Sequence, residues 1–109
     1  MEVLAEGVDR LWKAAEFLPR TVRLLGTRYR SLFLAHAAQC RPRGAAAPLA
    51  DALAFVDFML RQERVGLLDS ERSALRGDAR ALNRRFRLRR EGAEVDVVEK
   101  WKPLQWIGL

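Results

Sequence analysis

The sequence is poor in the residues that build disulfide frameworks, metal sites and membrane spans. It has one cysteine, Cys40, and one histidine, His36, among 109 residues. One thiol excludes an internal disulfide framework and a structural zinc site made of several thiolates. No apolar run approaches the roughly 18 residues of a membrane-spanning helix, and acidic residues close to the N-terminus do not fit a secretory signal. We therefore expect a cytoplasmic protein that contacts no membrane.

Lysine is also rare, and the positive charge is carried by arginine. Only three of the 20 basic residues are lysines, and the formal net charge is +6. Residues 71–90 contain eight arginines against two acidic residues, so this stretch alone accounts for the whole excess. The preference for arginine is compatible with a GC-rich genome as well as with selection for arginine chemistry. In either case the excess positive charge is concentrated in residues 71–90.

The apolar residues predict a mainly α fold in one domain, residues 1–109. Half of the residues are hydrophobic, which suffices for a core at this chain length. Spacings of three and four residues indicate about five helices. These are expected at 2–18, 20–25, 28–39, 48–63 and 71–85, with residues 41–47 as a loop. Thr27 is expected to cap the third helix, and Asp69 or Ser70 the fifth.

The pattern changes after Phe86, where apolar and charged residues alternate. Two alternating runs, 86–90 and 94–98, flank a turn at 91–93 that contains Gly92, which predicts a β-hairpin. A two-stranded hairpin is marginal alone, so it requires the helices, a third strand or a partner. We expect a helical part at 1–85 and a C-terminal hairpin or small sheet with a tryptophan-containing tail at 86–109. An α+β arrangement is the alternative.

The sequence offers no convincing catalytic constellation. His36 and Cys40 share one face of a predicted helix, but no acidic residue accompanies them on that face. We expect both to be packing residues, although a Cys–His pair at this spacing is the only candidate for nucleophilic chemistry. Phosphate-binding loops and dinucleotide fingerprints are absent from the sequence. The chain is therefore predicted to be a non-enzyme with no metal or cofactor of its own.

The predicted fifth helix carries a straight basic stripe. Its arginines recur every four residues and therefore share one face: Arg72, Arg76, Arg80 and Arg84. Such a stripe contacts phosphates or acidic protein segments, or it is a solvated face that only aids solubility. No helix-turn-helix, zinc-finger or RNP-like pattern accompanies it, which makes nucleic acid the weaker of the two ligand hypotheses.

The hairpin is the second candidate binding surface, because an open strand edge can accept another strand. Trp101 and Trp106 either cap the core or act as aromatic anchors for a partner. The candidate residues for peptide or partner binding are Arg84, Arg85, Arg87, Leu88, Arg89, Val95, Val97, Trp101 and Trp106.

Residues 15–62 contain a pattern that is similar to a known family. Phe17-Leu-Pro-Arg-Thr-Val-Arg-Leu-Leu-Gly, then Tyr29-Arg-Ser-Leu-Phe33, and Asp51-Ala-Leu-Ala-Phe-Val-Asp-Phe-Met-Leu60 resemble the helical partner domains of TIM-barrel, multinuclear non-haem iron oxidases. Those domains act in the biosynthesis of ribosomally made, modified peptides, methanobactin-type pathways among them. They occur as separate subunits or as fused extensions, and the shared pattern is one of packing.

The resemblance implies a non-catalytic partner that binds a precursor (leader) peptide and docks on the oxidase, in a heterodimer or heterotrimer. Iron is expected in the oxidase and not in this chain. The leader would add as a strand to the small C-terminal sheet. The rival hypothesis is a basic nucleic-acid-binding regulator that uses the Arg72–Arg84 stripe, and a third is a structural assembly module.

Overall fold

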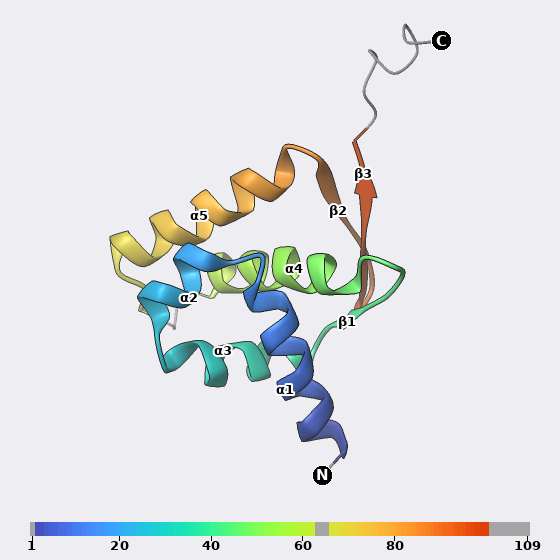
Figure 1. The fold of residues 1–109 in the computed structure, drawn as a ribbon, viewed down its shortest axis with the longest axis horizontal. Helices are drawn as coiled ribbons and strands as arrows, with labels where there is room; N and C mark the ends of the chain where they lie inside the picture. Colours follow the sequence, from blue (N-terminus) through green and yellow to red (C-terminus); the bar gives the residue numbers. More distant parts are fainter. Residues whose placement is uncertain (1, 63–65, 101–109) are drawn as a thin grey trace, which may run out of the picture.

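The computed structural model describes residues 2–62 and 66–100. Five helices are combined with a small three-stranded sheet, two strands of which lie near the C-terminus (Figure 1), which confirms the mainly α prediction. The elements in chain order are α1 (Glu2–Ala15), α2 (Pro19–Leu25), α3 (Arg28–Ala37), β1 (Arg41–Pro42), α4 (Ala47–Arg61), α5 (Asp69–Asn83), β2 (Phe86–Glu91) and β3 (Glu94–Glu99).

Helix α4 is the centre of the molecule. It contacts α1, α3, α5 and all three strands, and Figure 1 shows it between α5 on one side and α1 and α3 on the other. The segment is buried continuously from Leu49 to Val56, because its residues are apolar on almost every face. In the main core Phe55 of α4 packs against Tyr29 and Phe33 of α3, in tilted and edge-to-face contacts with ring centroids 5.3–5.6 Å apart.

Helix α1 packs closely on α3 through a small residue. A Cβ built at Gly7 would lie 3.0 Å from Leu34 Cδ2, so glycine at this point lets the two helices approach. Leu11 is buried as the helical spacing predicts, but Trp12 is 61% exposed. Trp12 continues the apolar spacing of α1 but lies outside the buried face, because the face that α1 buries is narrower than its hydrophobic pattern.

The helix ends differ from the predicted caps. Gly26 ends α2 with a positive φ of 56°, and Thr27, predicted to cap α3, makes no side-chain capping hydrogen bond. Helix α5 begins at Asp69, and Glu71 Oε1 accepts from the backbone N–H of Leu68 at 2.9 Å. Neither Asp69 nor Ser70 is the cap. Instead, the Glu71 carboxylate in the first turn of α5 binds the backbone N–H of Leu68, the residue before the helix.

The sheet has three strands in the order β1-β3-β2, with β3 in the middle. β2 and β3 are antiparallel, and β1 pairs in parallel with the start of β3. The predicted loop at 41–47 therefore begins with a strand, which supplies the third strand that the hairpin requires. The turn consists of Gly92 and Ala93 alone, because Glu91 and Glu94 are a register pair. Gly92 has φ 62°, and a glycine at the first central position is typical of a two-residue hairpin turn.

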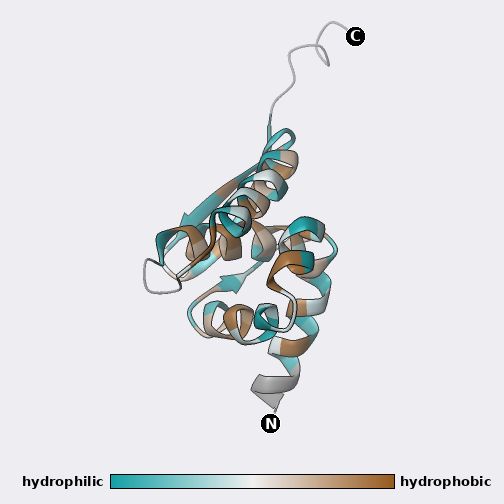
Figure 2. Cartoon of the chain, turned by 90° about the vertical axis from the view of Figure 1, so that its left-hand side faces the viewer, coloured by the Kyte–Doolittle hydropathy of each residue, from teal (hydrophilic) through white to brown (hydrophobic). Residues whose placement is uncertain are grey.

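The sheet lies against one end of α4 and forms a second, smaller core with it. Cys40, Ala50, Ala54 and Val95 make up this cluster. The outer face of the hairpin is polar, and Figure 2 shows the strands in mostly hydrophilic colours. None of the helices within residues 2–62 and 66–100 combines the length and the apolar character needed to cross a lipid bilayer.

Candidate functional site

Three of the predicted peptide-binding residues, Arg87, Leu88 and Arg89, lie on the edge strand β2, while Val95 and Val97 lie on the middle strand β3. β2 pairs only with β3 among the described strands, so its other side is an open edge in that part of the chain. The backbone N–H of Lys100 donates to Arg85 O at 2.7 Å. Because the hydrogen-bonding direction alternates along an antiparallel ladder, Arg87 and Arg89 turn their backbone groups toward β3. Leu88 and Arg90 turn theirs to the open edge.

The side chains of the hairpin divide between two faces. Leu88 lies opposite Val97 in the register, and both are half-buried against the smaller core. Val95 shares this inner face and is only 1% exposed. We therefore revise its role, because a side chain buried beneath the sheet supports the strands and has no surface for an incoming peptide. Arg87 and Arg89 lie on the outer face.

Several arginines predicted to attract a ligand are already paired. Arg89 makes two hydrogen bonds to Asp96, at 2.9 and 2.6 Å, and these bonds hold the pKa of Asp96 below its usual value. Arg90 Nη2 lies 3.0 Å from Asp57 Oδ2 of α4, and Arg85 lies 3.6 Å from Glu99. No ion pair is found for Arg84 or Arg87 within residues 2–62 and 66–100. These two carry the uncompensated charge beside the edge.

Sequence reasoning missed Arg43, which follows β1. Its guanidinium reaches Glu91 Oε2 at 3.0 Å and Glu94 Oε2 at 3.4 Å across the hairpin turn. This ion pair joins the start of the sheet to the turn. No local pattern predicts this ion pair, because the partners are about fifty residues apart and the segment has no helical or strand periodicity. Trp101 and Trp106 lie outside the described residues.

The basic stripe lies on the surface of α5 as predicted. Arg72 is half-buried, and Arg76, Arg80 and Arg84 are exposed. The helix buries a narrow face that includes Leu75, and it also buries two carboxylates, Glu71 and Asp78. Arg20 of α2, which sequence reasoning did not single out, lies beside the stripe. Together with Arg72, Arg76 and Arg80 it lines a hollow between α2 and α5.

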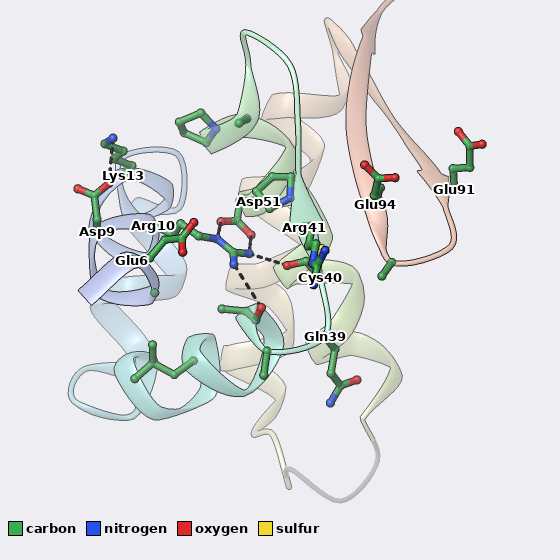
Figure 3. Close-up of a pocket in the computed structure, with 18 residues that line it drawn as sticks. Glu6, Asp9, Arg10, Lys13, Gln39, Cys40, Arg41, Asp51, Glu91 and Glu94 are labelled. Atoms are coloured by element: carbon green, nitrogen blue, oxygen red, sulfur yellow. Dashed lines mark hydrogen bonds and ion pairs between the residues drawn. The ribbon is translucent and has the colours of Figure 1, made fainter. Parts of the chain in front are cut away.

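A second polar cluster lies in a cavity, an open space of about 1400 Å³ between α1, α3, α4 and the hairpin turn. Figure 3 shows Arg10 extending from α1 to Asp51 of α4. Arg10 Nε and Nη2 donate to the two oxygens of Asp51 at 2.9 and 3.0 Å. The same guanidinium donates to the backbone oxygens of Ala37 and Cys40, at 3.2 and 2.9 Å.

His36 belongs to this cluster, which corrects a prediction. His36 and Cys40 are buried as expected, but an acidic residue does accompany them. His36 Nε2 lies 2.7 Å from Asp51 Oδ1. Asp51 of α4 is 1% exposed and binds both Arg10 and His36. Helical spacing within one segment does not reveal a partner that comes from another helix.

The arrangement fits a structural ion-pair network better than a reaction centre. Burial opposes the charged form of Arg10, but the hydrogen bond and negative charge of Asp51 outweigh it, and the pKa of Arg10 lies above its usual value. Burial and the charge of Asp51 raise the pKa of Cys40, so the thiol stays protonated and is a poor nucleophile. His36, Cys40 and Asp51 bring three potential metal ligands together. However, both oxygens of Asp51 are hydrogen-bonded, and the Arg10 guanidinium would repel a cation there.

No protein-family model, curated protein or solved structure matches this chain. The function is therefore argued from the geometry of the chain itself, and the resemblance of residues 15–62 enters only as a hypothesis.

Proposed function

We propose that this domain is a non-catalytic partner subunit that binds a precursor (leader) peptide as an added strand along the open edge of β2. In the same proposal it docks on a metal-dependent, peptide-modifying oxidase. The observation that carries the proposal is the edge itself: β2 has one unpaired side in the described chain, and its Leu88 and Arg90 backbone groups point outward. Backbone groups of this kind bind a strand with little dependence on its sequence.

The side chains beside the edge define the chemistry of the peptide. A strand added next to β2 places alternate residues on the two faces of the sheet. Its outer residues would lie beside Arg87 and Arg89, where opposite charges stabilise cross-strand pairs. Its inner residues would lie beside Leu88, which is half-buried against the helices. The preferred ligand is therefore an extended peptide in which acidic and apolar residues alternate.

A matched pair of variants tests strand addition. Arg90→Ala and Arg90→Pro both remove the ion pair to Asp57, but only proline removes the outward N–H. We expect an alternating valine–glutamate peptide to bind Arg90→Ala much as it binds the parent chain, and Arg90→Pro about tenfold more weakly, with an alternating valine–lysine peptide as the control ligand. Equal binding by the two variants, with both folded, would contradict strand addition.

The oxidase partner is inferred from the resemblance of residues 15–62, and iron is expected in that partner. The test is co-purification from the native host, with the captured protein identified by mass spectrometry and by its iron content. Capture of an iron-containing TIM-barrel protein supports the proposal. Retention of DNA or RNA in its place would favour the alternative.

The alternative function is nucleic-acid binding by the basic stripe. It is favoured by one observation: Arg76, Arg80 and Arg84 are exposed and make no ion pair with another described residue. Binding of this kind falls steeply with salt because it releases counterions. It should also be lost when these three arginines become alanine. Strand addition at β2 should survive both moderate salt and the triple substitution.

A further inference from the structure

A hollow of about 390 Å³ lies between α2 and α5. Four arginines line it, Arg20 from α2 and Arg72, Arg76 and Arg80 from α5, together with Ser73 and Asp69. Its lining is therefore polar almost throughout. Asp69 supplies the only carboxylate of the lining against four guanidinium groups, so the hollow has a formal excess of positive charge.

The four arginines have no acidic partner within the described chain. Several arginines elsewhere have an acidic partner: Arg28 lies 2.8 Å from Glu71, and Arg89 and Arg90 are paired with Asp96 and Asp57. Asp78 is the acidic residue that faces α2, but its carboxylate is used by the backbone, with Thr21 N–H donating to Oδ2 at 2.8 Å. Guanidinium groups held together without a counter-charge repel one another, and a bound anion relieves that repulsion.

Gly77 makes room for one of these guanidinium groups. It lies in the interior of α5, where glycine costs about 1 kcal/mol relative to alanine. A Cβ built at Gly77 would lie 2.5 Å from Arg20 Nη1, and its three nearest heavy atoms all belong to the Arg20 side chain. The absence of a side chain at Gly77 thus allows Arg20 to lie against α5 beside the stripe. The Asp78 carboxylate accepts from the backbone N–H groups of Arg20 and Thr21, and this contact positions the Arg20 backbone next to α5.

We propose that this hollow is a binding site for a compact oligophosphate. Arginine forks match phosphate oxygens in bidentate geometry, and Ser73 adds a hydroxyl donor within the same lining. A polyvalent phosphate chain compensates several guanidinium charges at once, which a single carboxylate does not. The polar lining has no apolar platform for an aromatic ring or base, so the phosphate groups themselves are the recognised part. The site is independent of the β2 edge.

The test is titration of the full chain with sodium tripolyphosphate at low ionic strength, followed by calorimetry. Arg76→Ala should weaken binding about tenfold, the effect of losing a hydrogen bond between charged groups. The matched control is Arg30→Ala, which removes one charge from the exposed face of α3 and should leave affinity nearly unchanged. Asp69→Asn should strengthen binding, because it removes the one negative charge at the hollow.

Gly77→Ala is the sharpest variant, because it changes no charge. The added methyl displaces Arg20 and should weaken tripolyphosphate binding severalfold, while the melting temperature stays the same or rises. Arg20→Ala should show the same loss. Unchanged affinity in a folded Gly77→Ala would overturn the proposal. So would equal losses in Arg76→Ala and Arg30→Ala, or a single-stranded oligonucleotide that binds more tightly than tripolyphosphate and extends to Arg84.

Discussion

Asp51 connects three parts of the chain through one carboxylate. From α4, Asp51 binds Arg10 of α1 and His36 of α3. Arg10 in turn donates to the backbone oxygens of Ala37, the last residue of α3, and of Cys40. Buried charges are tolerated where pairing and hydrogen bonds replace water. The cluster therefore fixes the mutual position of α1, α3 and α4, beside the sheet.

Replacing Asp51 should destabilise the fold far more than replacing a surface acid. Asp51→Asn leaves the Arg10 guanidinium without its counter-charge, and we expect a loss of about 3 kcal/mol in the free energy of unfolding. Asp57→Asn is the control, because Asp57 pairs with Arg61 and Arg90 in a partly exposed position; it should cost about 1 kcal/mol or less. Urea unfolding of both variants measures the difference, and equal losses would contradict the structural role of Asp51.

Tyr29 should make stability fall at high pH. It is the single tyrosine, its hydroxyl donates to Leu11 O at 2.6 Å, and burial, with the charge of Asp51, raises its pKa. Below the usual tyrosine pKa of about 10, both states keep the proton and pH has no effect through this group. Above it the unfolded chain loses the proton while the folded chain keeps it, so the free energy of unfolding decreases.

The measurement is absorbance of tyrosinate during an alkaline titration. The signal should appear together with unfolding, as followed by circular dichroism. Tyr29→Phe should weaken the alkaline decline, at a cost of about 1 kcal/mol at neutral pH for the lost hydrogen bond. Tyrosinate absorbance in a fully folded sample near pH 10 would show that the hydroxyl is not protected.

At the scale of elements, the hairpin depends on its two-residue turn. Gly92 has φ 62°, which an L-residue adopts only with strain, so Gly92→Ala should destabilise the hairpin by about 1–2 kcal/mol. Ala93→Gly is the control, since Ala93, the other residue of this turn, does not have a positive φ. Amide hydrogen exchange should speed up in β2 and β3 of Gly92→Ala and remain slow in α4. Uniform acceleration through the helices would mean that the hairpin does not open separately.

The elements that periodicity specifies were predictable, and those that depend on distant partners were not. All five helices and both hairpin strands follow from local spacing, because amphipathic faces repeat within each segment. β1 was missed because two residues, one of them Pro42, form a strand only by pairing with β3. For the same reason the contacts of Asp51, Arg43 and Arg20 had no local signal: each joins segments far apart in the sequence.

At the scale of the molecule, the arginine-rich stretch divides into two surfaces. The arginines of the hairpin are largely neutralised by Asp57, Asp96 and Glu99, while those of α5 face the hollow beside α2 without acidic partners in the described chain. A net charge of +6 therefore says little about the sheet. We expect peptide binding at β2 to depend mainly on backbone pairing, and anion binding at α5 to depend mainly on charge.

The salt dependence of the two surfaces should differ accordingly. Raising the salt concentration from 50 to 200 mM should reduce tripolyphosphate affinity strongly, since exposed charges are screened over about 10 Å at 0.1 M. Binding of the valine–glutamate peptide should fall only slightly over the same range. Calorimetry in both buffers provides the comparison, and an equally steep fall for the peptide would indicate general attraction to arginine.

The most direct test of the central claim is residue-resolved amide exchange with and without the valine–glutamate peptide. The N–H groups of Leu88 and Arg90 face the open edge, whereas those of Arg87 and Arg89 already face β3. If the peptide adds as a strand, exchange slows at Leu88 and Arg90 and changes little at Arg87 and Arg89. Peptide binding with no added protection at Leu88 and Arg90 would contradict the account.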